Sequence, residues 1–190
     1  FEKDFAYYYD VIVSFVNDRE LTQQVGQALY YFAKYGLIAD FRTPRYKKVL
    51  DNNLNDAFKK IFENATPELK QEIDQFYNFN GERKYSNIID YSETAEKIIE
   101  LMGGLIFKIQ IPKNNNDYFI IPDVAAATFR EKINLYYNPD IKEIAYIGLP
   151  LSSKIYIHFY SEKLFKDTVP DSSIVFCDST IVTKYNHANF

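Results

Sequence analysis

Apolar residues recur every three or four positions along the first half of the chain, which is the spacing of one helix face. The first stripe is Phe1, Phe5, Tyr8, Ile12 and Phe15. Asp18 is suited to cap a second helix, whose stripe is Leu21, Val25, Leu29 and Phe32. Pro44 ends that helix, because proline has no N–H to donate, and it can begin a third one. The third stripe is Tyr46, Leu50, Leu54, Phe58 and Ile61.

Two shorter helices are predicted next. Thr66-Pro67-Glu68 supplies a cap, a first-turn proline and an acid at the positive end of the helix dipole. Residues 92–102 form the fifth helix, which Gly103-Gly104 closes.

The pattern becomes extended after Gly104. The β-rich runs 105–111 and 118–121 flank a turn-rich linker at 113–117, which predicts a hairpin. Residues 144–147, 155–160 and 174–176 are further strand candidates.

The order of these elements predicts an α+β fold. An N-terminal layer of about five helices (about residues 1–103) is expected to pack on a C-terminal, mainly antiparallel β-sheet (about residues 104–190) in a single domain. Because the chain begins with Phe1 rather than Met, we expect a fragment that lacks its native ends.

The composition narrows the class of protein. A net charge of −4 argues against general nucleic-acid binding, and no apolar run is long enough to span a membrane. Cys177 is the single cysteine among 190 residues, which excludes a disulfide framework and favours the cytoplasm. The 17 tyrosines and 16 phenylalanines make the chain unusually aromatic, which an A/T-rich genome explains without a functional role.

The corner Arg42-Thr43-Pro44-Arg45 is a candidate ligand-binding site. Arg42 is favoured near a helix C-terminus, whereas Arg45 falls in a first turn, where a cation is disfavoured. A bound anion such as phosphate or carboxylate would explain this placement. The alternatives are an ion pair with Asp40 or Asp51, or simple solvent exposure.

Three further residues are candidates for catalysis. The first is Asp123, because the order Pro122-Asp123 and then Asp140-Ile141-Lys142 is also found in metal-dependent nucleases. Against this reading, Asn138-Pro139-Asp140 looks like a turn. The alternative is that Asp123 makes a local hydrogen bond. Alternation places His158 between Tyr156 and Tyr160, on a face that is either a polar, aromatic pocket or solvated. Glu2 is a candidate carboxylate for metal or acid–base chemistry.

Cys177-Asp178 with His158 or His187 has no spacing that indicates a metal site or a nucleophile set, so no metal is predicted, and the sequence leaves any cofactor unknown.

The motifs together resemble a bacterial family of uncharacterised proteins known as domain of unknown function 4238. The resemblance covers nearly the whole chain and rests on 41–45, 118–123, 148–154 and Asn186. In that family a helix ends in Arg-Thr-Pro, a strand ends near Ser-Asp-Asn-Pro, and a Pro-Leu-Ser segment follows. Here Pro122-Asp123-Val124-Ala125 keeps only the acid, and the usual histidine and proline ahead of the first helix are absent. The family has no established activity.

Two functions follow as expectations. The first is a bacterial intracellular domain that binds a protein partner or an anionic small molecule through Arg42 and Arg45. The alternative is a phosphate-substrate hydrolase, in which Glu2 and Asp123 would meet the two arginines in one cleft. Purely structural roles for all these residues are a third reading.

Overall fold

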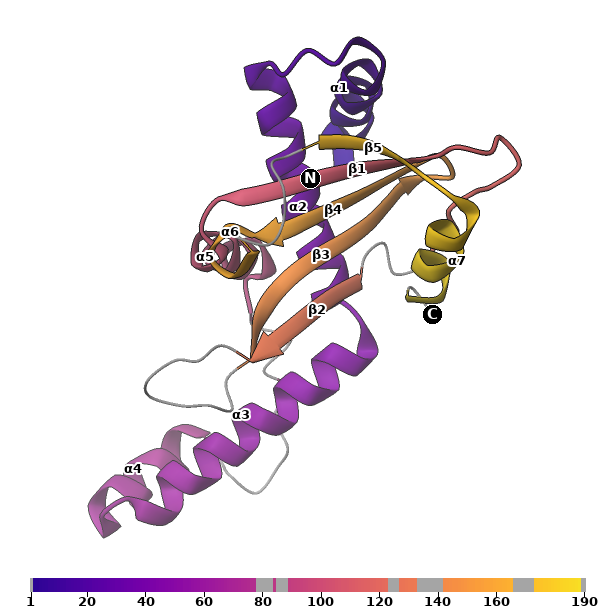
Figure 1. Cartoon of the computed structure of the whole chain (residues 1–190). Coiled ribbons are helices and arrows are strands. Elements are labelled where there is room, and N and C mark those ends of the chain that lie inside the picture. The colour runs from indigo at the N-terminus through magenta and orange to yellow at the C-terminus, as the bar shows by residue number, and fades with distance from the viewer. Residues whose placement is uncertain are drawn as a thin grey trace. The chain divides into compact units, whose positions relative to one another are not determined.

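The chain forms helices first and strands second, as the sequence predicts. The computed structural model describes residues 2–77, 84, 89–122, 127–132, 142–165 and 173–188. The fold is α+β, and the five strands in these ranges belong to one mixed sheet (Figure 1). Within the same ranges, no helix is both long enough and apolar enough to cross a bilayer.

Five α-helices precede the sheet in the described chain. They are α1 (Phe5–Asp18, after a 3₁₀ turn at Glu2–Asp4), α2 (Gln23–Phe41), α3 (Pro44–Asn64), α4 (Pro67–Tyr77) and α5 (Tyr91–Met102). The predicted cap of α2 is wrong, because Asp18 ends α1. Thr22 takes that place, and its Oγ1 accepts a hydrogen bond from the Val25 N–H at 3.3 Å. Leu21 lies in the connecting loop and is 65% exposed.

The chain divides into two compact units, Phe1–Asp40 with Ser92–Phe190 and Phe41–Tyr91. The second unit contains α3 and α4. Within it, the ring of Phe41 lies 4.9 Å from that of Tyr46 and 6.2 Å from that of Tyr91. No described side chain of α3 is fully buried, so its apolar stripe is partly exposed. The single domain expected from the sequence stays a prediction.

The sheet belongs to the first unit and has the strand order β2-β3-β4-β1-β5. The strands are β1 (Leu105–Pro112), β2 (Ala127–Lys132), β3 (Lys142–Ser152), β4 (Ile155–Ser161) and β5 (Ser173–Cys177). Neighbouring strands are antiparallel except for β1 and β5, which are parallel. The mainly antiparallel sheet is therefore confirmed.

The predicted hairpin around residues 113–117 is wrong. β1 lies inside the sheet, where it pairs with β4 on one side and β5 on the other. Residues 118–121 form no strand, and the Phe119 N–H donates to the Ser153 carbonyl at 2.9 Å. β4 pairs with β1 over six positions, whereas residues 118–121 could pair with β1 over four positions at most.

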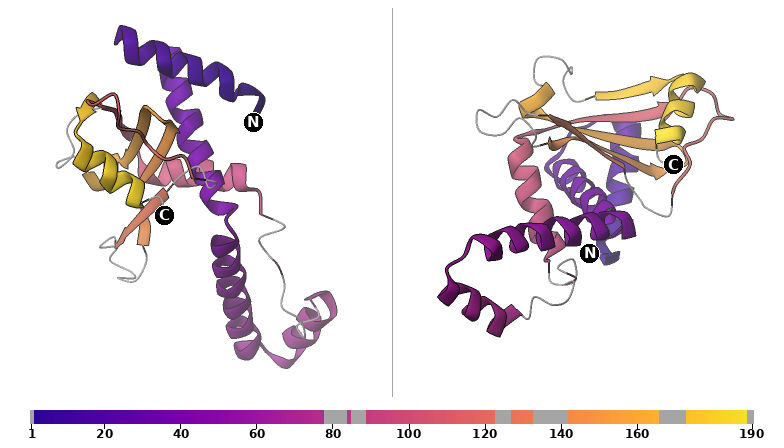
Figure 2. Two further views of the ribbon diagram at one scale, coloured as in Figure 1. Left: turned by 90° about the vertical axis from the view of Figure 1, so that its right-hand side faces the viewer. Right: turned by 90° about the horizontal axis from the view of Figure 1, so that it is seen from below.

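Helices cover both faces of the sheet. α2 and α5 lie on one face, and α7 (Ser179–Ala188) lies on the other (Figures 1 and 2). A short helix, α6 (Glu162–Phe165), follows β4. α1 reaches the sheet through Phe15, whose ring lies 6.1 Å from that of Phe107. β4 is consequently buried on both sides: Ile157 is 0% exposed on one face and His158 is 5% exposed on the other.

Three elements, β2, α6 and α7, were not predicted from the sequence. The start of α7 is rich in β-branched residues, which favour strands. Asp178 nevertheless caps the helix, because its Oδ1 accepts a hydrogen bond from the Ile181 N–H at 3.1 Å. Val182 is 4% exposed and belongs to a buried cluster with Phe119 and Tyr156. Packing of α7 on the sheet thus outweighs the preference of its β-branched residues for a strand.

Candidate functional site

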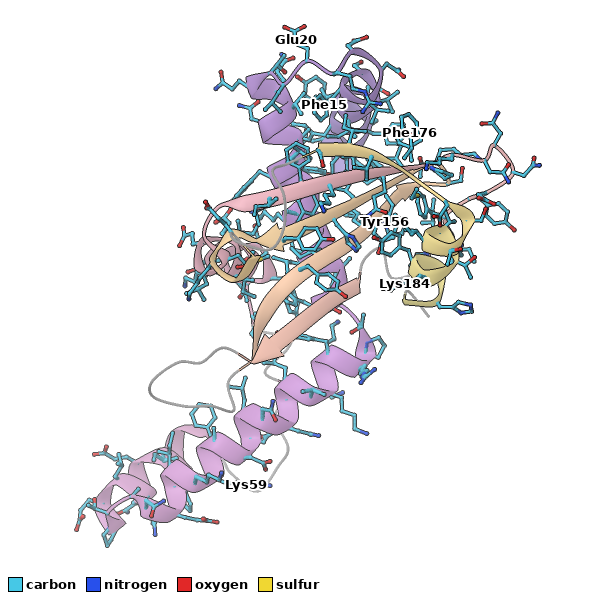
Figure 3. All side chains as sticks on the ribbon, in the orientation of Figure 1. Phe15, Glu20, Lys59, Tyr156, Phe176 and Lys184 are labelled. Carbon is cyan, nitrogen blue, oxygen red and sulfur yellow. The ribbon has the colours of Figure 1, made fainter. Side chains whose placement is uncertain are left out.

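A cluster of polar and aromatic side chains lies between the sheet and α7. Tyr156 and His158 project from β4 on this face, and Figure 3 shows Tyr156 beside α7. The ring of Tyr185 stacks on that of Tyr156 at 4.8 Å and meets that of His158 edge-on at 4.7 Å. We call the following residues the histidine cluster: Gln110, Tyr146, Tyr156, His158, Tyr160 and Tyr185.

Hydrogen bonds orient the imidazole of His158. The amide Nε2 of Gln110 donates to the Tyr185 hydroxyl at 2.6 Å and lies 3.4 Å from His158 Nδ1. The Tyr160 hydroxyl lies 3.3 Å from the same nitrogen. An amide N–H can only donate, so this arrangement assigns the role of acceptor to Nδ1 and the ring proton to Nε2.

The cluster is uncharged at neutral pH. Burial, with smaller effects of Lys108 and Lys184, lowers the pKa of His158 to about 3. Burial also raises the pKa of Tyr160 to about 12 and the pKa of Tyr185 above its ordinary value. An imidazole with so low a pKa is a poor general base near pH 7. The arrangement suits a neutral hydrogen-bonding residue, and a catalytic role for His158 stays a prediction.

Gly148 allows β3 to approach the cluster closely. It pairs with His158 in the β3–β4 ladder. A Cβ at this position would lie 2.3 Å from the Tyr156 hydroxyl and 3.0 Å from His158 Nε2. The absence of a side chain is therefore a packing requirement of the cluster.

Three of the segments that carry the family resemblance meet at one end of the sheet. Asn186 of α7 accepts a hydrogen bond from the Ile120 N–H at 2.9 Å and donates to the Tyr118 carbonyl at 3.0 Å. The Phe119 N–H between them donates to Ser153 in the turn that follows β3. The amide of Asn186 thus replaces the neighbouring strand that residues 118–121 lack.

Replacing Asn186 by Ala is expected to lower the free energy of unfolding by about 1 kcal/mol, because two backbone groups lose their partner. Urea unfolding followed by circular dichroism measures the change. Asn115→Ala is the matched control, since Asn115 is exposed and its side chain makes no hydrogen bond within the described residues. An equal effect of the two variants would contradict the bridging role.

The carboxylates proposed for catalysis are not part of the described geometry. Asp123 lies outside the described residues, as do Asp140-Ile141-Lys142 of the nuclease pattern, apart from Lys142 in β3. Glu2 begins the 3₁₀ turn, and its side chain is not described. Their convergence with Arg42 and Arg45 stays a prediction.

The arginine corner belongs to the second unit. Thr43 caps α3, because its Oγ1 accepts from the Tyr46 N–H at 3.1 Å and its carbonyl accepts from the Lys47 N–H at 3.0 Å. Arg42 and Arg45 are exposed on either side of this cap. Neither forms an ion pair with a carboxylate in the part of the chain that the structure describes. The two guanidinium groups are therefore open to solvent and to an external anion.

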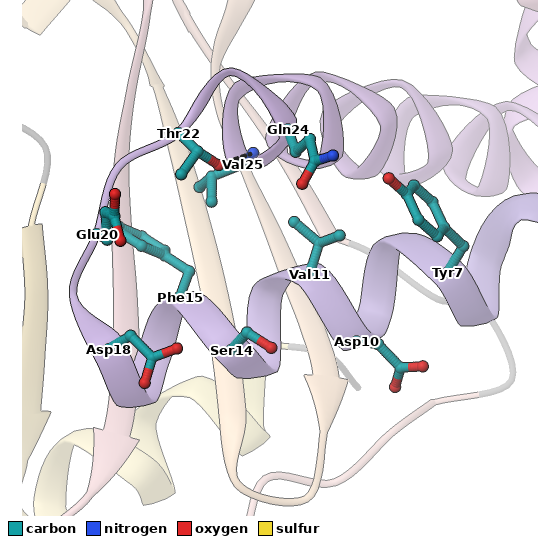
Figure 4. Close-up of a pocket in the computed structure, with 10 residues that line it drawn as sticks. All are labelled: Tyr7, Asp10, Val11, Ser14, Phe15, Asp18, Glu20, Thr22, Gln24 and Val25. Carbon is teal, nitrogen blue, oxygen red and sulfur yellow. Dashed lines mark hydrogen bonds between the residues drawn. The ribbon is translucent and has the colours of Figure 1, made fainter.

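An acidic pocket of about 280 Å³ lies between α1 and α2. Figure 4 shows Asp18 and Glu20 at one end, Tyr7 at the other, and Val11 and Gln24 between them. Among the described residues, no group of three or more His, Cys, Asp or Glu side chains could hold a metal ion.

Cys177 and Asp178 have structural roles in this fold. The thiol of Cys177 is 2% exposed and donates to the Ile111 carbonyl at 3.5 Å. Burial raises the pKa of this thiol, which disfavours the reactive thiolate. Asp178 is the cap of α7.

The fold and the histidine cluster define an α+β protein with a mixed five-stranded sheet. No protein-family model, curated protein or solved structure matches the chain. The resemblance to domain of unknown function 4238 stays an expectation.

Proposed function

We propose that this protein is a binding domain whose second unit takes an anionic group, of a small molecule or of a protein partner, at Arg42 and Arg45. The observation that carries this proposal is the exposure of both guanidinium groups beside the capped start of α3. Guanidinium groups bind carboxylate and phosphate through paired, charge-assisted hydrogen bonds. We also propose a cytoplasmic location, because the chain has one cysteine and cannot form an internal disulfide.

The local geometry limits how the anion is held. The N–H groups of Tyr46 and Lys47 are already engaged by Thr43, and Pro44 has none. The N-terminus of α3 can therefore donate at most one backbone hydrogen bond to the anion, from the Arg45 N–H. The side chains of Arg42 and Arg45 must supply the remaining contacts. An exposed site of this kind is weakened by salt, so affinity is expected to fall as ionic strength rises.

The double variant Arg42→Gln and Arg45→Gln is expected to weaken binding of inorganic pyrophosphate by about tenfold or more, because charge-assisted hydrogen bonds are lost. Isothermal titration calorimetry at low salt measures this. Lys59→Gln with Lys60→Gln is the matched control: both lysines are exposed near the other end of α3, and the net charge changes equally (Figure 3 labels Lys59). Unchanged binding in the arginine variant, or equal loss in the control, would contradict the site.

A further inference from the structure

Helix α7 is held on the sheet by little apolar surface. Val182 is the only fully buried side chain among its described residues, and Tyr185 is half-buried. The hydrogen bonds of Asn186 and Ser179 with residues 117–120 lie at exposed positions, where water can replace them. An element with so few buried apolar contacts opens more readily than the core of a fold.

The sheet does not depend on α7 for its pairing. β4 pairs with β1 on one side and with β3 on the other. The opposite face of the sheet is covered by α2 and α5 (Figures 1 and 2). α7 can therefore leave the sheet while the strands stay paired.

His158 lies at the centre of the contact between α7 and the sheet. The ring of Tyr185 meets the imidazole edge-on at 4.7 Å, and the Tyr185 hydroxyl accepts a hydrogen bond from Nε2 of Gln110 at 2.6 Å. The same nitrogen of Gln110 lies 3.4 Å from His158 Nδ1. The contact suits a neutral imidazole, because a protonated Nδ1 would donate and would face another donor. Gln110 would then have to turn its amide, which breaks the hydrogen bond that it donates to Tyr185.

The charged groups around His158 oppose its protonation while α7 is docked. The titratable and charged groups that face the imidazole are Lys108 of β1, Tyr146 of β3, Tyr156 and Tyr160 of β4, and Lys184 and Tyr185 of α7. The two that are charged at neutral pH are both lysines, and Lys184 belongs to the helix itself (Figure 3). An imidazolium ion would repel both ammonium groups. Release of α7 removes Lys184 and admits water to the charged ring.

We propose that α7 is an acid-operated latch, which protonation of His158 releases from a sheet that stays folded. Burial lowers the pKa of His158 to about 3 in the docked state, and contact with water returns it toward the ordinary value of 6.5. Between these values, each pH unit of acidification favours the released state by up to about tenfold. The released helix uncovers the aromatic and polar face of the sheet that carries Tyr156, His158 and Gln110.

Cys177 provides a natural probe of this release. It is the one cysteine of the chain, and its thiol is 2% exposed in the buried cluster with Phe119, Tyr156 and Val182 of α7. Reaction with dithiodipyridine therefore requires α7 to move away. The labelling rate is divided by the rate of the urea-unfolded chain at the same pH, which removes the effect of pH on the thiol itself. The quotient measures the fraction of molecules in which α7 is released.

This fraction is expected to rise about eightfold from pH 6 to pH 5. It is expected to change little with low concentrations of urea, because release of one helix exposes much less surface than global unfolding. His158→Gln is expected to abolish the rise, and His187→Gln is the matched control that keeps it, since His187 is exposed. Tyr185→Phe, which lacks the hydroxyl that Gln110 binds, is expected to raise the fraction about fivefold at pH 7.

Three outcomes overturn the proposal. The first is labelling with the urea dependence of global unfolding, which would make α7 an inseparable part of the core. The second is a released fraction that is the same at pH 6 and at pH 5. The third is a rise that both His158→Gln and Tyr185→Phe leave unchanged, which would assign the exposure of Cys177 to fraying of β5. The latch lies in the first unit, so none of these results bears on Arg42 and Arg45.

Discussion

Acidification below about pH 6.5 is expected to destabilise the protein through His158 alone, with a slope that approaches about 1 kcal/mol per pH unit near pH 5. Burial lowers the pKa of this imidazole to about 3 in the folded state, whereas the ordinary histidine value is 6.5. Between these values the unfolded chain binds one more proton than the folded chain, so acid favours unfolding. The loss begins as the pH falls below 6.5 and ends near pH 3, where the folded protein also accepts the proton.

Urea unfolding at several pH values measures this slope. His158→Gln is expected to be less stable at neutral pH, because ring contacts in the cluster are lost, but its stability is expected to change less with pH. His187→Gln is the matched control, since His187 is exposed at the end of α7, and it should keep the slope of the native chain. Equal slopes in the native chain and in His158→Gln would contradict a buried, neutral imidazole.

Gly148→Ala is expected to lower the free energy of unfolding by about 1–3 kcal/mol, because the new methyl group overpacks the histidine cluster. The Cβ would lie 2.3 Å from the hydroxyl of Tyr156, a side chain that is 1% exposed and stacked against Tyr185. Neither ring can move without disturbing α7. Gly26→Ala is the matched control, and it should be neutral or stabilising by up to about 1 kcal/mol, because alanine favours the helix.

A double-mutant cycle with Tyr156→Phe tests the cause of this effect. Phenylalanine lacks the hydroxyl nearest to the new methyl group, so Gly148→Ala is expected to cost less in the Tyr156→Phe background. The relief is partial, because His158 Nε2 would still lie 3.0 Å from the methyl group. Additive effects of the two changes would indicate that the methyl group is accommodated elsewhere.

The candidate site was predictable only in outline. Alternation along 155–160 correctly places His158 on the same face as Tyr156 and opposite Ile157. This alternation contains no information about α7. That helix was not predicted, and its Tyr185 covers the face of the sheet on which His158 lies. The corner at Arg42 and Arg45 was predicted from local rules, and Thr43 caps α3 there as the proline at position 44 implies.

The sequence by itself determined the α+β class, the five early helices and the faces of β4, because each depends on periodicity and on caps within a few residues. The tertiary structure alone decided that β1 pairs with β4 and β5 rather than with residues 118–121, and that the β-branched start of α7 becomes helical. It also decided the ionisation of His158 and the need for glycine at position 148. The physical reason is that burial and close approach arise between segments far apart in the chain, so no local pattern records them.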